Sequence, residues 1–134
     1  MVTGVFLEFG SPLPFLPRLL AALLGSVLVV VAVVVFAYAI RQFQSARTPV
    51  PGNKPTTVIV RTGPYRFSRN PIYVAFSLFQ LGIASWVNSV WLIATLIAAV
   101  ALMTAVVIPR EERYLERRFG ADYLDYKRSV RRWL

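Results

Sequence analysis

The sequence predicts an all-α integral membrane protein with three transmembrane helices, at about residues 19–40, 71–86 and 90–108, followed by cytoplasmic C-terminal helices. The chain is 57% hydrophobic with a mean hydropathy of +0.59, above the roughly 45–50% apolar content of soluble domains. It also contains two long charge-free runs, residues 19–40 and 70–109. A soluble domain of 134 residues cannot bury so much apolar surface. In lipid, only helices pair their own backbone groups within one segment.

The first span follows an apolar segment, residues 1–17, which prolines interrupt and which is too short to cross a bilayer. We interpret this segment as a lead-in on the outer membrane face. The charge-free run 19–40 has the roughly 20 residues that one spanning helix requires. Gly25 and Ser26 form a small-residue patch in it, which predicts close approach of another helix.

The next segment, residues 41–69, is predicted to be a loop because prolines and glycines punctuate it, with a turn at Gly63-Pro64. Its charged residues are all basic, and basic loops beside spans favour the cytoplasmic face. The basic residues are Arg41, Arg47, Lys54, Arg61, Arg66 and Arg69.

The second charge-free run, residues 70–109, is about twice as long as one span and therefore predicts a helical hairpin. Asn70 and Pro71 have the residue types of a helix N-cap and first helical position. Asn88 and Ser89 are expected to form the tight outer turn, and Pro109 to kink or break the third span. A charged helix at 110–119 and a shorter one at about 121–131, covering the site, complete the chain.

The predicted topology places the N-terminus outside and the C-terminus in the cytoplasm, with residues 1–134 forming one membrane-embedded domain. The net charge of +9 favours membrane lipids over nucleic acid as a partner. The reason is that the basic residues border the spans and mix with acids in the C-terminal segment.

The chemistry available to the chain is limited, because it contains neither cysteine nor histidine. Thiolate or imidazole metal sites and a Ser-His-Asp triad are therefore excluded, and no metal site is predicted. Carboxylates, tyrosines, arginines, amides or a bound cofactor must carry any reaction.

Two polar motifs flank the predicted hairpin and would meet at one membrane face. A helix that starts at Asn70 offers free N–H groups to an anion, with Arg66 and Arg69 nearby and Tyr73 one turn further on. The same pattern is also typical of a simple capped helix start.

The second motif is Glu111-Glu112, which follows the hairpin. Carboxylates in this position are commonly just solvated, but the pair could bind a cationic group such as an ammonium or sulfonium. Combined with the first motif, it would form a pocket for a zwitterion such as an amino acid moiety.

These motifs resemble the isoprenylcysteine carboxyl methyltransferase and phospholipid methyltransferase superfamily over about residues 41–134. The resemblance rests on Gly63-Pro64-Tyr65-Arg66, on Arg69-Asn70-Pro71-Ile72-Tyr73, and on Glu111-Glu112 with Leu115, Phe119-Gly120, Tyr123 and Tyr126. It implies a membrane methyltransferase that uses S-adenosylmethionine. The implied cofactor-binding residues are Tyr65, Arg69, Asn70, Tyr73, Glu111 and Glu112, with Glu111, Glu112 and Arg69 as the catalytic candidates.

The sequence departs from the pattern of this superfamily at three places. Asn70 stands where eukaryotic members have His, and Ala75 stands where a Gly is common. Relatives usually have another span before the first one predicted here, so the chain is either a short member or a homodimer supplies the missing wall.

The expected reaction is direct methyl transfer to a lipophilic acceptor that enters from the lipid. The acceptor could be a carboxylate, an amine or a thiol. An amine would need a base, for which Glu111 or Glu112 is the candidate. Two other functions stay open: a non-catalytic membrane scaffold of the same fold, and a sterol-type reductase using NADPH. The sequence shows no glycine-rich dinucleotide loop to favour the reductase.

Overall fold

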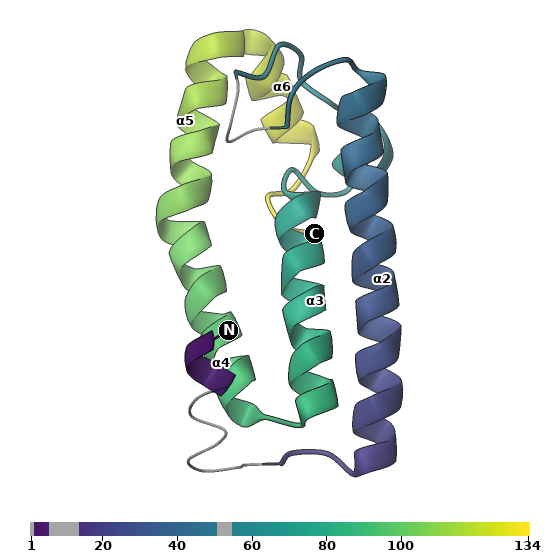
Figure 1. The fold of residues 1–134 in the computed structure, drawn as a ribbon. Helices are drawn as coiled ribbons and strands as arrows, with labels where there is room; N and C mark the ends of the chain where they lie inside the picture. Colours follow the sequence, from purple (N-terminus) through teal and green to yellow (C-terminus); the bar gives the residue numbers. More distant parts are fainter. Residues whose placement is uncertain (1, 6–13, 51–54) are drawn as a thin grey trace.

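The computed structural model describes residues 2–5, 14–50 and 55–134, and these residues form helices and connecting segments without any strand. Figure 1 shows α2 and α3 side by side, with the column of α4 and α5 beside α3. Part of the predicted outer lead-in, residue 1 and residues 6–13, lies outside the described residues, and so do the loop residues 51–54. The elements are α2 (Arg18–Ser45), η1 (Gly63–Arg66), α3 (Pro71–Val87), α4 (Val90–Leu102), η2 (Met103–Val107), α5 (Ile108–Phe119) and α6 (Ala121–Ser129).

Helix α2 is longer than the predicted span, since it continues through Arg41 and ends only at Ser45. The charge at Arg41 marks the end of the apolar run, whereas the helix itself continues until the chain approaches Pro49. The buried residues of α2 are mostly small, and they form a stripe along one face of the helix. They are Ala21, Gly25, Ala32, Ala39 and Phe43.

Helices α2 and α3 approach each other closely, as the small-residue patch predicted. A Cβ added to Gly25 would lie 2.3 Å from the Trp86 ring and 2.8 Å from the Gly82 carbonyl oxygen. The Trp86 indole N–H donates to the Ala22 carbonyl at 3.2 Å and to Ser26 Oγ at 3.1 Å. Small residues therefore fix the distance between these two helices.

The prediction of three spans is not confirmed. Two continuous helices, Arg18–Ser45 and Val90–Phe119, are long and apolar enough to cross a membrane, whereas α3 has only 17 residues. At 1.5 Å per residue α3 reaches about 26 Å, short of the roughly 30 Å hydrocarbon core. The turn after α3 is as predicted: Asn88 adopts a left-handed conformation, and the Ser89 side chain caps α4 by accepting from the Leu92 N–H.

Pro109 was expected to kink or break the helix, and the break does not occur, because the helix continues through this residue. The preceding turn, η2, is a π-helix, and the Ile108 N–H donates to the Met103 carbonyl. This wider turn accommodates the proline ring and its missing N–H without ending the helix. The charged residues after Pro109 are therefore carried on a rigid extension of the apolar helix, and Gly120, at φ 54°, separates α5 from α6.

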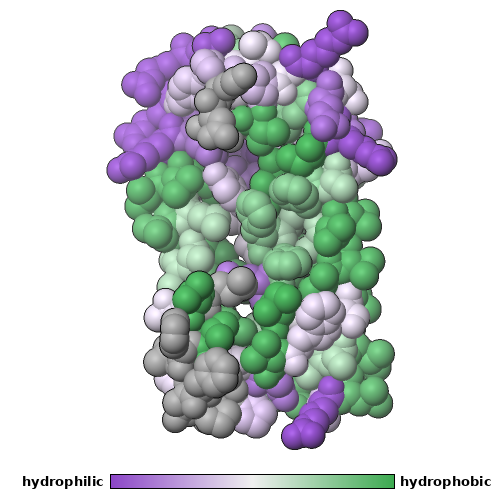
Figure 2. All heavy atoms as spheres, viewed as in Figure 1, coloured by the Kyte–Doolittle hydropathy of each residue, from purple (hydrophilic) through white to green (hydrophobic). Residues whose placement is uncertain are grey.

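The apolar parts of the two long helices mostly expose their side chains on the outside of the bundle. Only 17% and 11% of their most apolar windows are buried, the opposite of the core helix of a soluble protein. Exposed side chains on α2 include Leu19, Leu23, Val27 and Val30. Figure 2 shows a broad hydrophobic zone along the bundle and a concentration of hydrophilic residues at the end that carries α6.

A small core lies at this hydrophilic end, between α2 and the segment that connects α2 to α3. It consists of Ala39, Phe43, Val60 and Tyr65, and the Phe43 and Tyr65 rings meet edge to face with centroids 5.2 Å apart. Helix α6 is joined to this core because the Tyr126 hydroxyl donates to the Tyr65 carbonyl at 2.8 Å. The core therefore fixes the position of the elements that surround the site.

Candidate functional site

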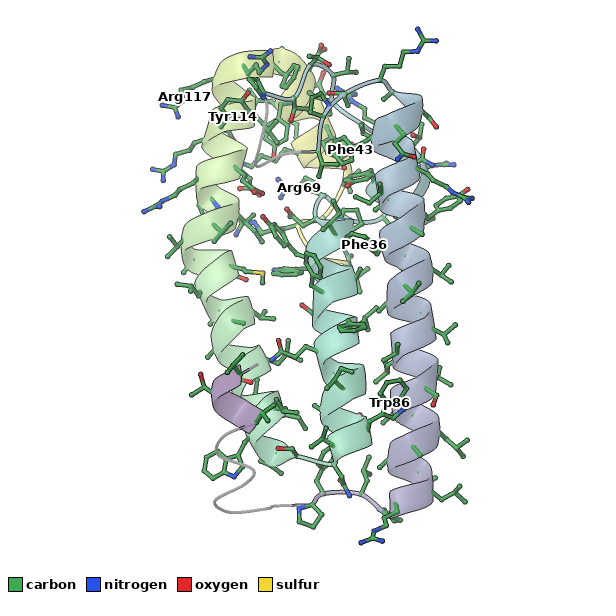
Figure 3. The ribbon with its side chains drawn as sticks, in the orientation of Figure 1. Phe36, Phe43, Arg69, Trp86, Tyr114 and Arg117 are labelled. Carbon is green, nitrogen blue, oxygen red and sulfur yellow. The ribbon has the colours of Figure 1, made fainter. Side chains whose placement is uncertain are left out.

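A cavity of about 800 Å³ opens between α2, the start of α3 with the segment before it, α5 and α6. All six predicted site residues belong to its wall, although they come from two separate parts of the chain, residues 65–73 and 111–112. Figure 3 shows Arg69 in the space between α5 and α2, with Phe36 and Phe43 on the α2 side. The six residues are Tyr65, Arg69, Asn70, Tyr73, Glu111 and Glu112.

The first contact across the cavity wall joins Tyr73, in the first turn of α3, to Glu111 on α5. The Tyr73 hydroxyl donates to Glu111 Oε1 at 2.7 Å. Glu111 lies beyond the apolar run that ends at Pro109. Its burial raises the pKa of the carboxyl above the ordinary value, while the hydrogen bond from Tyr73 acts in the opposite direction. Among the described residues, Glu111 has no cation within ion-pair distance.

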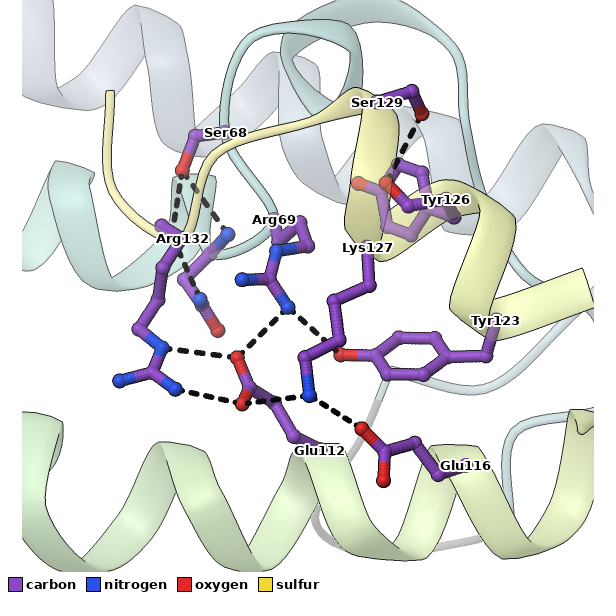
Figure 4. A network of polar contacts seen from close by, with 10 residues as sticks. Ser68, Arg69, Glu112, Glu116, Tyr123, Tyr126, Lys127, Ser129 and Arg132 are labelled. Atoms are coloured by element: carbon purple, nitrogen blue, oxygen red, sulfur yellow. Dashed lines mark hydrogen bonds and ion pairs between the residues drawn. The ribbon is translucent and has the colours of Figure 1, made fainter.

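The second contact joins Glu112, one residue further along α5, to three cations. Arg69 Nη1 lies 2.8 Å from Glu112 Oε1, Arg132 Nη2 lies 2.8 Å from Oε2, and Lys127 Nζ lies 3.9 Å from Oε2. Glu112 is only 6% exposed. Figure 4 shows this cluster, in which Lys127 also pairs with Glu116 and Arg69 also reaches the Tyr123 hydroxyl.

The two adjacent glutamates are therefore not equivalent. Consecutive residues on a helix point about 100° apart, so Glu111 faces Tyr73 while Glu112 faces the arginines. Both oxygens of Glu112 already accept charge-assisted hydrogen bonds. Glu111 has a hydroxyl as its partner and keeps acceptor capacity that a ligand could use.

Asn70 stands at the predicted N-cap position, but its side chain makes no capping hydrogen bond. Its Nδ2 instead donates to the Arg132 carbonyl at 2.8 Å, because segment 130–134 runs alongside residues 68–70. Arg66, expected to help bind an anion, lies outside the cavity wall and borders a separate hollow beside Tyr38 and Phe67.

One wall of the cavity is apolar and belongs to α2 and α3. The Phe36 and Phe76 rings lie 5.6 Å apart between centroids, and Ile40 and Ile72 line the same cavity. From the sequence, Phe36, Ile40 and Phe76 were expected only as parts of membrane spans, and Ile72 as part of a span and of the motif that begins at Arg69. The helical spacing of Phe36 and Ile40 could have indicated a shared face, but no sequence pattern places that face opposite Glu111.

The tyrosines of the site are held in the neutral form. Burial, and then the proximity of Tyr126, raise the pKa of Tyr65. Burial and Tyr123 raise the pKa of Tyr126, which Arg69 and Arg61 partly oppose. Both hydroxyls therefore remain protonated across the physiological pH range.

Two buried side-chain atoms of the described residues have no hydrogen-bond partner, Thr56 Oγ1 and Arg69 Nε. Both belong to residues of the cavity wall. Unpartnered buried donors carry a desolvation penalty that a ligand with acceptor atoms can relieve. In the described ranges, no group of three or more acidic, His or Cys side chains is placed to hold a metal ion.

The apolar helices, the converging charged motifs and the cavity are features of a helical membrane protein with a candidate site at one end. The family model for phospholipid methyltransferase matches residues 20–122. The chain belongs to this family of membrane methyltransferases, as the motif resemblance predicted. Together with the two long apolar helices, this membership indicates a membrane protein.

Curated relatives cover only part of the chain. A nickel-cobalt-cadmium resistance protein, NccN, of Alcaligenes xylosoxydans xylosoxydans is 38% identical over 75 residues, which is 56% of this chain and 35% of the relative. A cobalt-zinc-cadmium resistance protein, CzcN, of Cupriavidus metallidurans is 37% identical over 81 residues, 60% of this chain and 37% of the relative. The chain thus spans little more than a third of these proteins.

A third relative is much shorter. It is an uncharacterized protein of Haemophilus influenzae, 35% identical over 63 residues, which is 47% of this chain and 100% of the relative. No solved structure shows a significant match.

Proposed function

We propose that this protein transfers a methyl group from S-adenosylmethionine to a lipophilic acceptor at the cytoplasmic membrane face. One observation carries the proposal: the pairs Tyr73–Glu111 and Arg69–Glu112 bring both family motifs to the wall of one cavity. Family membership supports methyl transfer as the reaction class. The methyl donor, the acceptor and the roles of single residues are our proposal.

The cavity suits this cofactor in size and in the chemistry of its donors. Ligand pockets typically measure about 300–1,000 Å³, and this one measures about 800 Å³. S-adenosylmethionine carries an ammonium, a sulfonium and a carboxylate. Glu111 is the carboxylate of the wall that has no described cation partner and would hold a cationic group. Arg110, which lines the same cavity, would hold the carboxylate.

The bound cofactor supplies an electrophilic methyl group, so the protein needs no nucleophile of its own. Its residues would align the acceptor and exclude water around it. Tyr73 orients the Glu111 carboxylate through its hydrogen bond. For an amine acceptor, Glu111 Oε2 would take the proton, and the raised pKa of this carboxyl suits a base that works near neutral pH.

The acceptor would lie along the apolar wall formed by Phe36, Ile40, Ile72 and Phe76. This wall continues into the lipid-facing surface of the bundle, where exposed apolar residues of α2 and α3 include Phe36 and Phe76 themselves. A lipophilic molecule could therefore remain partly in lipid while its polar end reaches Glu111. This arrangement favours a lipid-like acceptor over a water-soluble one.

Calorimetric titration of the detergent-purified protein with S-adenosylmethionine and S-adenosylhomocysteine tests the proposal, with NADPH as control. We expect micromolar binding of the two methionine-derived compounds and none of NADPH. A labelled-methyl screen of lipid carboxylates, amines and thiols would then identify the acceptor. Absence of binding by both compounds would refute the cofactor assignment, and binding of NADPH alone would favour a reductase.

The proposed orientation places the end of the bundle with α5 and α6 in the cytoplasm, because its basic residues are numerous. Reporter fusion after Leu134 tests it. We expect an enzyme that is active only in the periplasm to stay silent in this position and a cytoplasmic fluorescent reporter to be visible. The reverse pattern would refute the orientation.

A further inference from the structure

We propose that Arg132 is a positioning residue of the cofactor site, which holds Glu112, Arg69 and Asn70 in place without touching the ligand itself. Arg132 is absent from the cavity wall, whereas the three residues it organises all belong to it. The inference rests on the proposed function, because it assigns a role to Arg132 in binding the methyl donor. It concerns a residue outside both motifs that flank the helical hairpin.

The guanidinium of Arg132 binds the Glu112 carboxylate through two parallel hydrogen bonds. Nε donates to Oε1 at 3.0 Å and Nη2 donates to Oε2 at 2.8 Å. Such a fork fixes the plane of a carboxylate, which a lysine ammonium cannot do. Glu112 Oε1 also accepts from Arg69 Nη1 at 2.8 Å, so the orientation of Arg69 depends on the same carboxylate.

The backbone around Arg132 is hydrogen-bonded to the turn before α3. The Arg69 N–H donates to the Arg131 carbonyl at 2.9 Å. Asn70 Nδ2 donates to the Arg132 carbonyl at 2.8 Å, and Ser68 Oγ reaches the same oxygen at 3.4 Å. Residues 68–70 are thus held on one side by segment 130–134 and on the other by Glu112 of α5.

The charged side chains of this cluster differ in burial. Glu112 is buried, while the Arg132 side chain is 35% exposed. Arg69 is buried as well, at 9%, so the Glu112 carboxylate lies between a buried and a half-exposed guanidinium, with the Lys127 ammonium further away at 3.9 Å. Removal of Arg132 would leave the Arg69–Glu112 pair without its fork and free both side chains to rotate toward the cavity.

Three variants test the inference: Arg132→Met, which removes the fork, Arg132→Lys, which keeps the charge, and Arg131→Met as a matched control. The control is apt because Arg131 is exposed and contacts residue 69 through its carbonyl. We expect S-adenosylhomocysteine affinity to fall at least tenfold for Arg132→Met, several-fold for Arg132→Lys and not at all for Arg131→Met. Unchanged affinity for both Arg132 variants would overturn the proposal.

A double-mutant cycle with Glu112→Gln separates positioning from a general structural role. If Arg132 acts through Glu112, the losses in affinity will not be additive, whereas additive losses would contradict the inference. If Arg132→Met does not fold, the cycle is carried out with Arg132→Lys.

Hydrogen exchange provides a readout that is independent of the cofactor. The Arg69 amide, which donates to Arg131, should lose protection in Arg132→Met and keep it in Arg131→Met. Unchanged protection would overturn the positioning role. If the wild-type protein binds neither methionine-derived compound, the proposed function fails, and exchange at residues 68–70 alone decides whether Arg132 orders this turn.

Discussion

The two ends of the helix bundle are held together in opposite ways. At the end near Trp86, α2 and α3 are in close contact because Gly25 and Gly82 leave no room for a side chain. At the other end, ion pairs centred on Glu112 join α5, α6 and residues 68–70, and a cavity of about 800 Å³ remains between them. Close packing thus provides a rigid base, while charged contacts hold the elements around an open site.

The comparison predicts that the polar end depends most strongly on one residue, Glu112. Glu112→Gln leaves Arg69 and Arg132 without their counter-charge, and breaking a buried ion pair by removing one partner costs about 3 kcal/mol. We expect the largest loss of thermal stability in detergent for this variant. Glu116→Gln is the control, because Glu116 is more exposed and pairs with Lys127 at the edge of the cluster. Equal midpoints for the two variants would contradict the central role of Glu112.

The close-packed end is tested by Gly25→Val. The new Cβ would lie 2.3 Å from the Trp86 ring, so the helices must separate, at a cost of about 2 kcal/mol. Val30→Leu on the same helix is the control, since Val30 is 61% exposed. We expect Gly25→Val alone to lower the unfolding temperature, with cofactor affinity retained below it. A drop in affinity without a drop in stability would show that the two ends are coupled.

A smaller effect is expected from Tyr126→Phe, which removes the hydrogen bond between α6 and the Tyr65 carbonyl. One such bond contributes about 1 kcal/mol. Burial raises the pKa of Tyr126 in the folded protein. Above the ordinary tyrosine pKa of about 10, this hydroxyl therefore ionises in the unfolded chain while it stays protonated in the folded one. Stability is therefore fully present below about pH 10 and falls as pH rises further.

The same variant tests how stability falls at alkaline pH. Tyr126→Phe should lose less stability between about pH 9 and 11 than the wild-type protein, although Tyr65 still contributes to the fall. The measurement is thermal unfolding across this pH range. An identical alkaline slope in both proteins would show that Tyr126 is not a source of the pH dependence.

The sequence predicted the parts of this structure that depend on local pattern. Long apolar runs, Pro71 at a helix start and small residues in α2 each have a direct physical consequence, and the two motifs that flank the hairpin met as expected. Pro109 was expected to kink or break the helix, and no break occurs because a π-turn can absorb a proline. The contacts of Arg132 were missed because they depend on a backbone path, from α6 back to Asn70, that no local signal encodes.

The adjacent glutamates Glu111 and Glu112 belong to one sequence motif but make different contacts, so variants of the two can be compared directly. Glu111→Gln keeps an acceptor for the Tyr73 hydroxyl and leaves the Arg69–Glu112 cluster untouched, so we expect a stability change within about 0.5 kcal/mol. Loss of the charge should weaken S-adenosylhomocysteine binding at least about tenfold, because charge-assisted hydrogen bonds contribute about 1.5–3 kcal/mol. Thermal unfolding and calorimetry on the same preparation measure both effects. Wild-type affinity would show that Glu111 does not contact the cofactor, whereas a large loss of stability would show that the two glutamates share one structural role.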